Sequence, residues 1–329
     1  MRKNKTVKRI WEVLNSEDNF LLVTHKNPDG DAVGSILGLY YFLLERNKKV
    51  DLYIPGGIPY FYQFLAVENL STFDCNKSYN VAVFLDCGDV ERIGENNGFI
   101  EKIPLIINID HHPTNTYFGN INLVDPSASS VTEILTNLIL KFDKNISEKT
   151  AECFLTGLIT DTGSFRFSNT TINSLKTAIK LMEKGANISY ISKEVYEKKS
   201  LSSLKLLGTA LVRLRSEDGI AYSFISQEDM IENNAKIEDI EGIIDVIRTL
   251  RESKIAVLFY PISSQTTKVS LRSKSQSIDV GSIAKSHGGG GHKEAAGFEK
   301  LGKPEDVSKE IIQELKEYIK RNESFLISK

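Results

Sequence analysis

A short loop near the start of the chain carries three side chains that could bind a metal ion. The segment HKNPDGDAVGS directly follows the apolar run FLLVT and contains His25, Asp29 and Asp31. Imidazole nitrogens and carboxylate oxygens suit a hard or borderline divalent cation, and Pro28 and Gly30 favour a tight turn that would hold them together. The alternative is an ordinary turn in which Asp31 caps the next helix. For this loop alone, the capping interpretation is favoured.

Three further positions along the chain offer the same kinds of ligand. Asp86 ends the apolar run VAVFL, and Asp110, His111 and His112 end the run LIINI. An unpaired buried carboxylate is costly, so Asp86 requires a cation or a hydrogen-bonding partner, and bridging two metal ions would meet that need. A further acidic residue, Asp161, follows a helical pattern in TGLITDTGSF. The recurrence of potential ligands at strand ends favours a metal site over coincidence.

Alternating strand and helix patterns indicate how these residues are brought together. Short apolar runs at 20–24, 49–54, 81–86 and 105–110 are separated by helical patterns, which predicts an α/β fold with a mostly parallel sheet flanked by helices. Residues 32–47 carry apolar side chains at helical spacing and would form the crossover between the first two strands. Open sheets of this kind bind ligands at the carboxyl ends of their strands, where the candidate metal ligands lie.

The last third of the sequence predicts a second, smaller α+β domain. Strand-like runs occur in IAYSFIS, KIAVLFYPI and TKVSLRSK, with helices expected at 239–252 and 303–320. We therefore expect a metal-binding domain at 1–195, a helical linker at 196–212 and a substrate-binding domain at 213–329.

The second domain contains residues suited to binding a phosphate group. Residues without side chains let backbone N–H groups approach phosphate oxygens, and His292 would add a donor beside the glycine run. The guanidinium of Arg272 can bind two phosphate oxygens, and the hydroxyl of Ser273 can bind a third. The alternatives are a linker for the glycines and an exposed strand for Arg272 and Ser273. The run contains Gly289, Gly290 and Gly291.

Composition and charge limit the class of protein. The chain has 41 Lys and Arg against 43 Asp and Glu, so no global basic field is available to bind long duplex nucleic acid. Cys75, Cys87 and Cys153 are too few for a disulfide framework and lack C-x-x-C spacing, which fits a reducing cytoplasm. No apolar stretch is long enough to span a membrane, and the basic N-terminal segment lacks the core of a signal peptide. We expect a cytoplasmic protein with no membrane partner.

Four motifs together resemble the DHH phosphoesterase superfamily, which is named for an Asp-His-His triplet. They are HKNPDGDAVGS, FLDCGD, IDHHPTN and GLITDTGSFRFSNT, and the triplet here is Asp110, His111 and His112. The segments SLRSK and GGGGHKEAAGF are similar to the Arg-Ser element and the glycine-rich signature of the DHH-associated domain. The order and length of the two halves resemble the nanoRNase and 3',5'-bisphosphate nucleotidase (pAp phosphatase) branch.

The resemblance implies ligands for two divalent metal ions, with Mn²⁺ as the first choice. The donor set by itself also permits magnesium or cobalt. Asp86 would bridge the ions, Asp110 would orient the histidines, and His112 would face the substrate phosphate. A purely structural role is the alternative for His112. The implied ligands are His25, Asp29 and Asp86 for one ion, and Asp31, Asp86, His111 and Asp161 for the other.

These expectations describe a two-metal phosphoesterase that needs no covalent nucleophile. The resemblance implies that it degrades short single-stranded oligonucleotides, namely nanoRNA of about two to five nucleotides, and converts pAp to AMP. It also implies a homodimer. The alternatives are a cyclic- or linear-dinucleotide phosphodiesterase, a catalytically silent nucleotide-binding module, and a family II inorganic pyrophosphatase. The GGGGHKEAAGF segment argues against the last of these.

Overall fold

The computed structural model describes residues 2–68, 70–94, 98–275, 277–291 and 293–327. The chain forms two compact units, Met1–Lys198 and Lys199–Lys329, each built around its own β-sheet.

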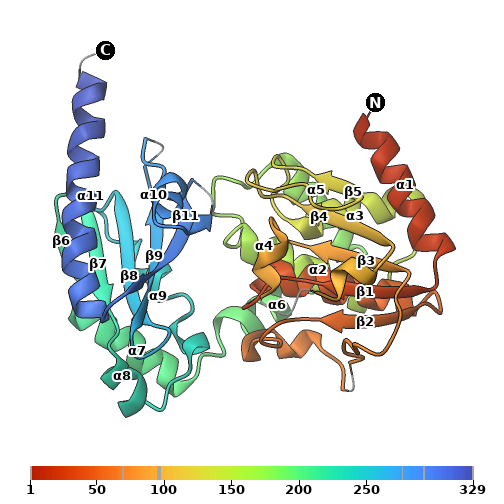
Figure 1. The fold of residues 1–329 in the computed structure, drawn as a ribbon, viewed down its shortest axis with the longest axis horizontal. Coiled ribbons are helices and arrows are strands. Elements are labelled where there is room, and N and C mark those ends of the chain that lie inside the picture. Colours follow the sequence, from red (N-terminus) through yellow and green to blue (C-terminus); the bar gives the residue numbers. More distant parts are fainter. Residues whose placement is uncertain (1, 69, 95–97, 276, 292, 328–329) are drawn as a thin grey trace. The chain divides into compact units, whose positions relative to one another are not determined.

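The first unit contains a parallel sheet of five strands in the order β2-β1-β3-β4-β5, shown in Figure 1. Four strands match the predicted apolar runs, which confirms the mostly parallel α/β fold. The fifth, of sequence INLV, was missed because it has only four residues and only every second one is buried. The strands are β1 (Asn19–Val23), β2 (Lys49–Tyr53), β3 (Val81–Leu85), β4 (Leu105–Asp110) and β5 (Ile121–Val124).

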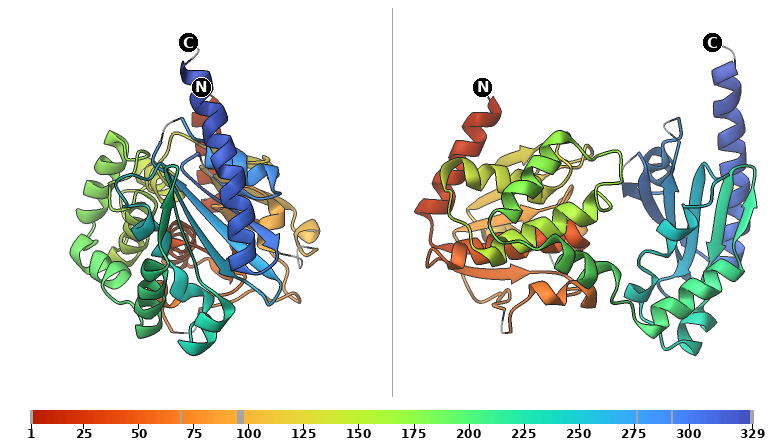
Figure 2. Two further views of the ribbon diagram at one scale, coloured as in Figure 1. Left: turned by 90° about the vertical axis from the view of Figure 1, so that its left-hand side faces the viewer. Right: turned by 180° about the vertical axis from the view of Figure 1, so that it is seen from behind.

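The two faces of this sheet have different coverings (Figure 2). Phe20 and Leu22 of β1 pack into a core formed with the helices, whereas Leu21 and Val23 pack against the segments around η2 and η3 on the opposite face. The helices are α1 (Arg2–Ser16), α2 (Gly30–Leu44), α3 (Val131–Phe142), α4 (Glu148–Asp161), α5 (Ile172–Met182) and α6 (Ile188–Tyr196). The 3₁₀ turns are η1 (Tyr60–Leu65), η2 (Val90–Ile93) and η3 (Ile100–Lys102).

The strand order creates a switch point between β1 and β3. From β1 the chain crosses through α2 to β2 on one side, then returns to form β3 on the other side of β1. Connections on the two sides of such a point leave in opposite directions, which opens a crevice at the carboxyl ends of the two strands. His25 follows β1 and Asp86 follows β3, so both lie at this crevice.

The second unit contains a mixed six-stranded sheet in the order β10-β11-β9-β8-β7-β6, which confirms the predicted α+β domain. Only β7 and β8 pair in parallel among its described strands. The strands are β6 (Arg215–Glu217), β7 (Ile220–Phe224), β8 (Ile255–Pro261), β9 (Thr266–Ser273), β10 (Gly290–Gly291) and β11 (Ala295–Leu301). The helical elements are α7 (Leu201–Val212), α8 (Gln227–Glu232), η4 (Ile237–Ile240), α9 (Ile243–Ile247), α10 (Val280–Ser286) and α11 (Pro304–Ile327).

The helix expected at 239–252 is shorter and interrupted. Gly242 has φ +83°, a left-handed conformation that separates η4 from α9. The segment 201–212 forms α7, whose Leu206 and Ala210 pack against Ala221 in a core of the second unit.

Within the described part of the chain, no helix has both the length and the low polarity required to cross a lipid bilayer.

Candidate active site

The turn after β1 directs the first histidine into the crevice. His25 is buried, and its Nδ1 lies 2.9 Å from the carbonyl oxygen of Lys26. A carbonyl can only accept, so Nδ1 carries a proton, and in the neutral ring the lone pair is therefore on Nε2. Nε2 lies 3.6 Å from Asp86 Oδ2. This tautomer is the one that binds a metal through Nε2.

The side chains of Asp29 and Asp31 accept hydrogen bonds from the starts of two different helices. Asp29 is the N-cap of α2, and its Oδ1 accepts hydrogen bonds from the backbone N–H groups of Asp31 and Ala32, both at 3.1 Å. Asp31 instead reaches the start of α3, where its two oxygens accept from Val131 N at 2.6 Å and Thr132 N at 3.0 Å. The capping alternative for Asp31 is therefore wrong for α2, because Asp29 fills that position.

Asp86 occupies the centre of the site. Its φ of +59° is left-handed, a conformation that costs a non-glycine residue about 1–3 kcal/mol and is concentrated at functional sites. Its Oδ1 lies 3.5 Å from His112 Nδ1 and 3.7 Å from His111 Nε2. Burial alone would raise the pKa of this carboxyl, but the contact with His25 and the charges of the other two histidines hold it below its usual range.

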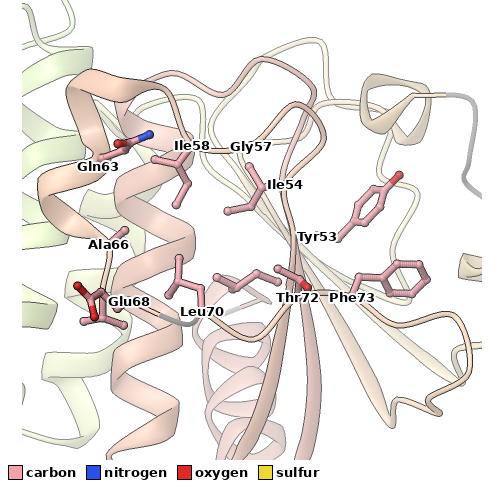
Figure 3. A pocket seen from close by; sticks show the side chains of 12 residues that line it. Tyr53, Ile54, Gly57, Ile58, Gln63, Ala66, Glu68, Leu70, Thr72 and Phe73 are labelled. Carbon is pink, nitrogen blue, oxygen red and sulfur yellow. The ribbon is translucent and has the colours of Figure 1, made fainter.

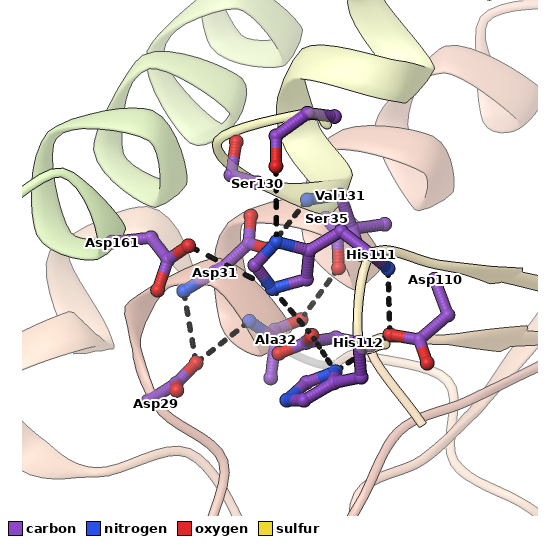
Figure 4. A network of polar contacts seen from close by, with 12 residues as sticks. Asp29, Asp31, Ala32, Ser35, Asp110, His111, His112, Ser130, Val131 and Asp161 are labelled. Atoms are coloured by element: carbon purple, nitrogen blue, oxygen red, sulfur yellow. Dashed lines mark hydrogen bonds and ion pairs between the residues drawn. The ribbon is translucent and has the colours of Figure 1, made fainter. Parts of the chain in front are cut away.

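Asp110 is the last residue of β4, and His111 and His112 follow it (Figure 4). His111 Nδ1 lies 3.3 Å from the carbonyl oxygen of Ala128, which directs Nε2 toward Asp86 and toward Asp161 Oδ2, 3.7 Å away. His112 Nδ1 lies 2.7 Å from Asp110 Oδ1, which also accepts from the backbone N–H of His111 at 2.8 Å. The fully buried Asp110 therefore contacts the imidazole of His112 and the backbone of His111.

Asp161, the last residue of α4, completes the cluster. Burial raises its pKa to about 7. Burial alone would lower the pKa of His111, but Asp161 and three further carboxylates raise it to about 9. In the metal-free protein these groups therefore hold protons near neutral pH, which a bound cation would displace.

The donor set fits divalent metal ions. Asp86 Oδ1 and Asp161 Oδ2 are buried and accept no hydrogen bond from the described residues, a costly state that a cation would relieve. The residues form three groups, and within each group the ligand atoms all lie within 4.8 Å of one another. These groups are His25, Asp29 and Asp86; Asp31, His111 and Asp161; and Asp86, His111 and His112.

Two buried asparagines near the triplet were missed by sequence reasoning. Asn115 Nδ2 donates to Asp110 Oδ2 at 2.6 Å and to Asn108 Oδ1 at 2.8 Å. Asn108 provided a signal, because it is a polar residue within the apolar strand LIINI. Asn115 stands in a loop where asparagine is common, so its type alone carried no signal.

The predicted phosphate-binding residues of the second unit differ in accessibility. Arg272 is partly exposed on β9, and its Nε lies 3.4 Å from Asp245 Oδ1. Ser273 is 1% exposed, and its hydroxyl donates to the Ser275 carbonyl at 3.0 Å and accepts from Ser275 N at 3.1 Å. The side chain of Ser273 is thus occupied within its own turn. His292 lies outside the described residues.

The three predicted glycines are also not equivalent. A side chain at Gly289 would meet the carbonyl oxygen of Gly297 at 2.3 Å, and one at Gly291 would meet that of Ala295 at 2.5 Å. Gly290 has open space at this position. Close packing of β10 against β11 therefore requires the outer two glycines, while the backbone at Gly290 can be approached by a ligand.

An apolar hollow of about 610 Å³ lies in the first unit between β2 and η1. Figure 3 shows Ile58 and Leu70 on opposite walls. Backbone hydrogen bonds connect the segment after β2 to the loop that carries His25, Asp29 and Asp31. Thr24 N donates to the Tyr53 carbonyl at 3.2 Å, and Asn27 N donates to the Pro55 carbonyl at 3.3 Å. None of the described residues that line the hollow is a predicted metal ligand.

Imidazole and carboxylate ligands at the switch point of a parallel sheet, followed by a separate α+β unit, are the arrangement of a metal-dependent phosphoesterase. Residues 19–158 match the DHH family, N-terminal domain, and residues 205–321 match the DHHA1 domain. The chain belongs to the DHH family of phosphoesterases.

Relatives share both units. The bifunctional oligoribonuclease and PAP phosphatase NrnA of Thermus thermophilus is 32% identical over 311 residues, which cover 93% of this chain and 91% of the relative. The Bacillus subtilis protein of the same name is 29% identical over 85% of this chain and 88% of its own length. The crystal structure of an exopolyphosphatase-related protein from Bacteroides fragilis superposes with a TM-score of 0.89 at 27% identity, covering 97% and 98% of the two chains.

Proposed function

We propose that this chain hydrolyses short single-stranded RNA of about two to five nucleotides to mononucleotides and converts pAp to AMP. The observation that carries the proposal is the set of three ligand groups at the switch point, in which Asp86 and His111 each belong to two groups. The names of the Thermus and Bacillus relatives support the two substrates, because those proteins are 32% and 29% identical over most of the chain.

The ligand groups support a site for two ions, with Mn²⁺ as the proposed metal. His25, Asp29 and Asp86 would hold one ion. Asp31, His111 and Asp161 would hold the other together with the second oxygen of Asp86. When bound, a pair of divalent cations supplies an activated water and neutralises charge on the phosphate.

The remaining residues would orient and bind the substrate. Asp110 holds His112 through Nδ1, so we assign Nε2 of His112 to a hydrogen bond with a phosphate oxygen. Arg272 and the backbone at Gly290 would bind a further phosphate oxygen. Ser273 is assigned to shaping the turn beside Arg272, since its hydroxyl is occupied. Gly289, Gly291 and His292 are kept as the remaining members of the proposed phosphate loop.

Two further proposals concern the whole molecule. Four exposed apolar residues on α5, spaced by three, four and three positions, support a homodimer formed by this helix. They are Ile172, Leu175, Ile179 and Met182. We place the protein in the cytoplasm, where the unpaired Cys75, Cys87 and Cys153 would stay reduced.

The test is hydrolysis of a 5'-labelled RNA ladder of two to about 24 nucleotides with Mn²⁺, run beside pAp and a cyclic dinucleotide. The proposal expects the shortest RNAs and pAp to be consumed while longer RNA persists. Consumption of the cyclic dinucleotide alone would replace it with a signalling phosphodiesterase. No turnover of any substrate would indicate a silent nucleotide-binding module.

A further inference from the structure

A buried chain of hydrogen bonds extends from the triplet into the first unit. His112 Nδ1 contacts Asp110 Oδ1 at 2.7 Å, and Asp110 Oδ2 accepts from Asn115 at 2.6 Å. Asn115 also donates to Asn108 Oδ1 at 2.8 Å, and Asn108 Nδ2 donates to the carbonyl of Cys87 at 2.9 Å. Asn108 and Asp110 are fully buried, and Asn115 is 7% exposed. The chain therefore connects His112 to the residue that follows Asp86.

The orientation of the Asn115 amide follows from its neighbours. Nδ2 faces three oxygen acceptors, because the Cys87 carbonyl also lies 3.4 Å away, whereas Oδ1 accepts from the backbone N–H of Tyr117 at 2.7 Å. The reversed amide would place its oxygen against three oxygens and its NH₂ group against an N–H donor, so only one orientation satisfies these contacts. The two short bonds from the amide nitrogen go to Asp110 and Asn108.

An amide suits this position for a chemical reason. Asp110 must remain an anion to accept from His112 and from the backbone N–H of His111. A lysine or arginine at 115 would compete with the imidazole for the same carboxylate. The neutral amide instead fixes Oδ2 without adding charge, so Oδ1 stays aimed at the histidine.

We propose that Asn115 is a positioning residue for His112. By fixing the Asp110 carboxylate, Asn115 holds the His112 imidazole with its proton on Nδ1 and with Nε2 directed away from Asp110. Asn108 supports Asn115 from the opposite side. The catalytic consequence rests on the proposed function, in which His112 contacts the substrate phosphate.

The kinetic test compares Asn115→Ala and Asn115→Asp with the wild type on a dinucleotide RNA in Mn²⁺. We expect kcat to fall about 10–100-fold, as for other residues that orient a ligating or catalytic group, with little change in KM. Asn115→Asp keeps the shape and the Tyr117 contact but sets a second carboxylate against Asp110, and circular dichroism of both variants checks that each is folded. The matched control is Asn122→Ala, which also removes two local amide hydrogen bonds, here to Gly119.

A double-mutant cycle separates positioning from general destabilisation. If Asn115 acts through His112, then Asn115→Ala should lower kcat by less than about threefold when His112 has already been replaced by asparagine. An undiminished loss in that background would overturn the proposal, as would wild-type kcat in both Asn115 variants. An equal loss in Asn122→Ala would also overturn it.

A spectroscopic measurement tests the same inference without turnover. In ¹⁵N-histidine spectra of the Mg²⁺-loaded protein, His112 should show the Nδ1–H form in the wild type and a mixture of tautomers in Asn115→Ala. A single unchanged tautomer in both proteins would overturn the inference. Because the spectrum needs no substrate, failure of the wild type to hydrolyse RNA or pAp would defeat the proposed function and leave this result to stand separately.

Discussion

The left-handed backbone of Asp86 places one small carboxylate between three imidazoles. Its Oδ2 faces His25, while its Oδ1 faces His111 and His112 and accepts no hydrogen bond from the described residues. Oxygens that point in two directions suit a bridge between cations. An asparagine at position 86 would fill the same space but would lack the negative charge of the carboxylate.

Replacement of Asp86 by asparagine should therefore remove activity while leaving the fold intact. We expect kcat/KM to fall by about 10³-fold or more, because bound metal contributes several kcal/mol to such reactions. The increase in melting temperature on adding Mn²⁺ should also be lost. Asp74→Asn, at an exposed turn outside the ligand groups, provides the control. Near-normal turnover by the Asp86 variant would refute the assignment of this residue as the shared ligand.

Metal binding should release protons, because the ligands of the metal-free protein hold them near neutral pH. His111 has a pKa of about 9 and Asp161 a pKa of about 7, both raised above the ordinary values of 6.5 and 3.8. Mn²⁺ requires neutral imidazole and ionised carboxylate, so its affinity should rise with pH up to about 9. Titration calorimetry at pH 7.5 in two buffers of different ionisation enthalpy measures the protons released. Identical heats in the two buffers would contradict the prediction.

The same two groups predict how the metal-free fold responds to pH. A pKa raised by folding means that the folded state binds the proton more tightly. The contribution of His111 to stability should therefore be complete below pH 6.5 and be lost as the pH rises through about 9. Asp161 should lose its contribution between about pH 4 and pH 7. Urea unfolding of EDTA-treated protein should show stability falling from pH 6 to pH 9, and His111→Asn should flatten this slope.

At the scale of elements, sequence patterns were sufficient for the regular parts of the fold. The strands β1, β3 and β4 could be predicted from their apolar runs, because buried parallel strands are apolar on both faces. The potential ligands that follow these runs indicated which edge of the sheet carries the site. The interruption of the expected 239–252 helix could not be predicted, because the sequence does not show that Gly242 adopts a left-handed conformation. The hydrogen-bond partners of these side chains could not be predicted either. The bonds between Asp31 and the start of α3 and between Asn115 and Asp110 depend on tertiary contacts that no local sequence pattern encodes.

Helices α2 and α4 approach closely because glycines line their contact. A side chain at Gly34 would lie 2.5 Å from the carbonyl oxygen of Cys153 and 2.9 Å from Gly157 N. These two helices carry Asp31 and Asp161, so their spacing sets the distance between two proposed ligands.

Gly34→Ala should consequently destabilise the first unit by about 1–3 kcal/mol, the usual cost of overpacking, and weaken Mn²⁺ binding. Urea unfolding monitored by circular dichroism measures the first effect, and calorimetry measures the second. Gly208→Ala on α7 is the matched control, because its new methyl group meets nothing within 4 Å and should stabilise its helix by about 0.5–1 kcal/mol. Equal stability of the Gly34 variant and the wild type would show that the helices can separate at little cost.

At the scale of the whole molecule, the exposed apolar row on α5 makes a testable statement about assembly. Introducing glutamate at Leu175 and Ile179 would bury charge in the proposed helix contact, so light scattering should report the mass of one chain instead of two. The control places glutamates at Leu204 and Leu211 of α7, which are similarly exposed, and should leave the dimer unchanged. A monomeric wild type would remove the dimer proposal altogether.

The proposed metal ligands all belong to the first unit, whereas the proposed phosphate-binding residue Arg272 belongs to the second. We therefore expect a change at Arg272 to affect substrate binding and not metal binding. Arg272→Ala should raise KM for pAp about tenfold or more through loss of a charge-assisted contact, while the increase in melting temperature caused by Mn²⁺ stays the same. Lys268→Ala is the matched control, since Lys268 lies on the same side of β9, pairs with Glu299 at 3.6 Å, and should change KM little. Loss of Mn²⁺ stabilisation in the Arg272 variant would mean that the residue acts on the metal site. An unchanged KM would exclude Arg272 from substrate binding and leave the phosphate to groups of the first unit.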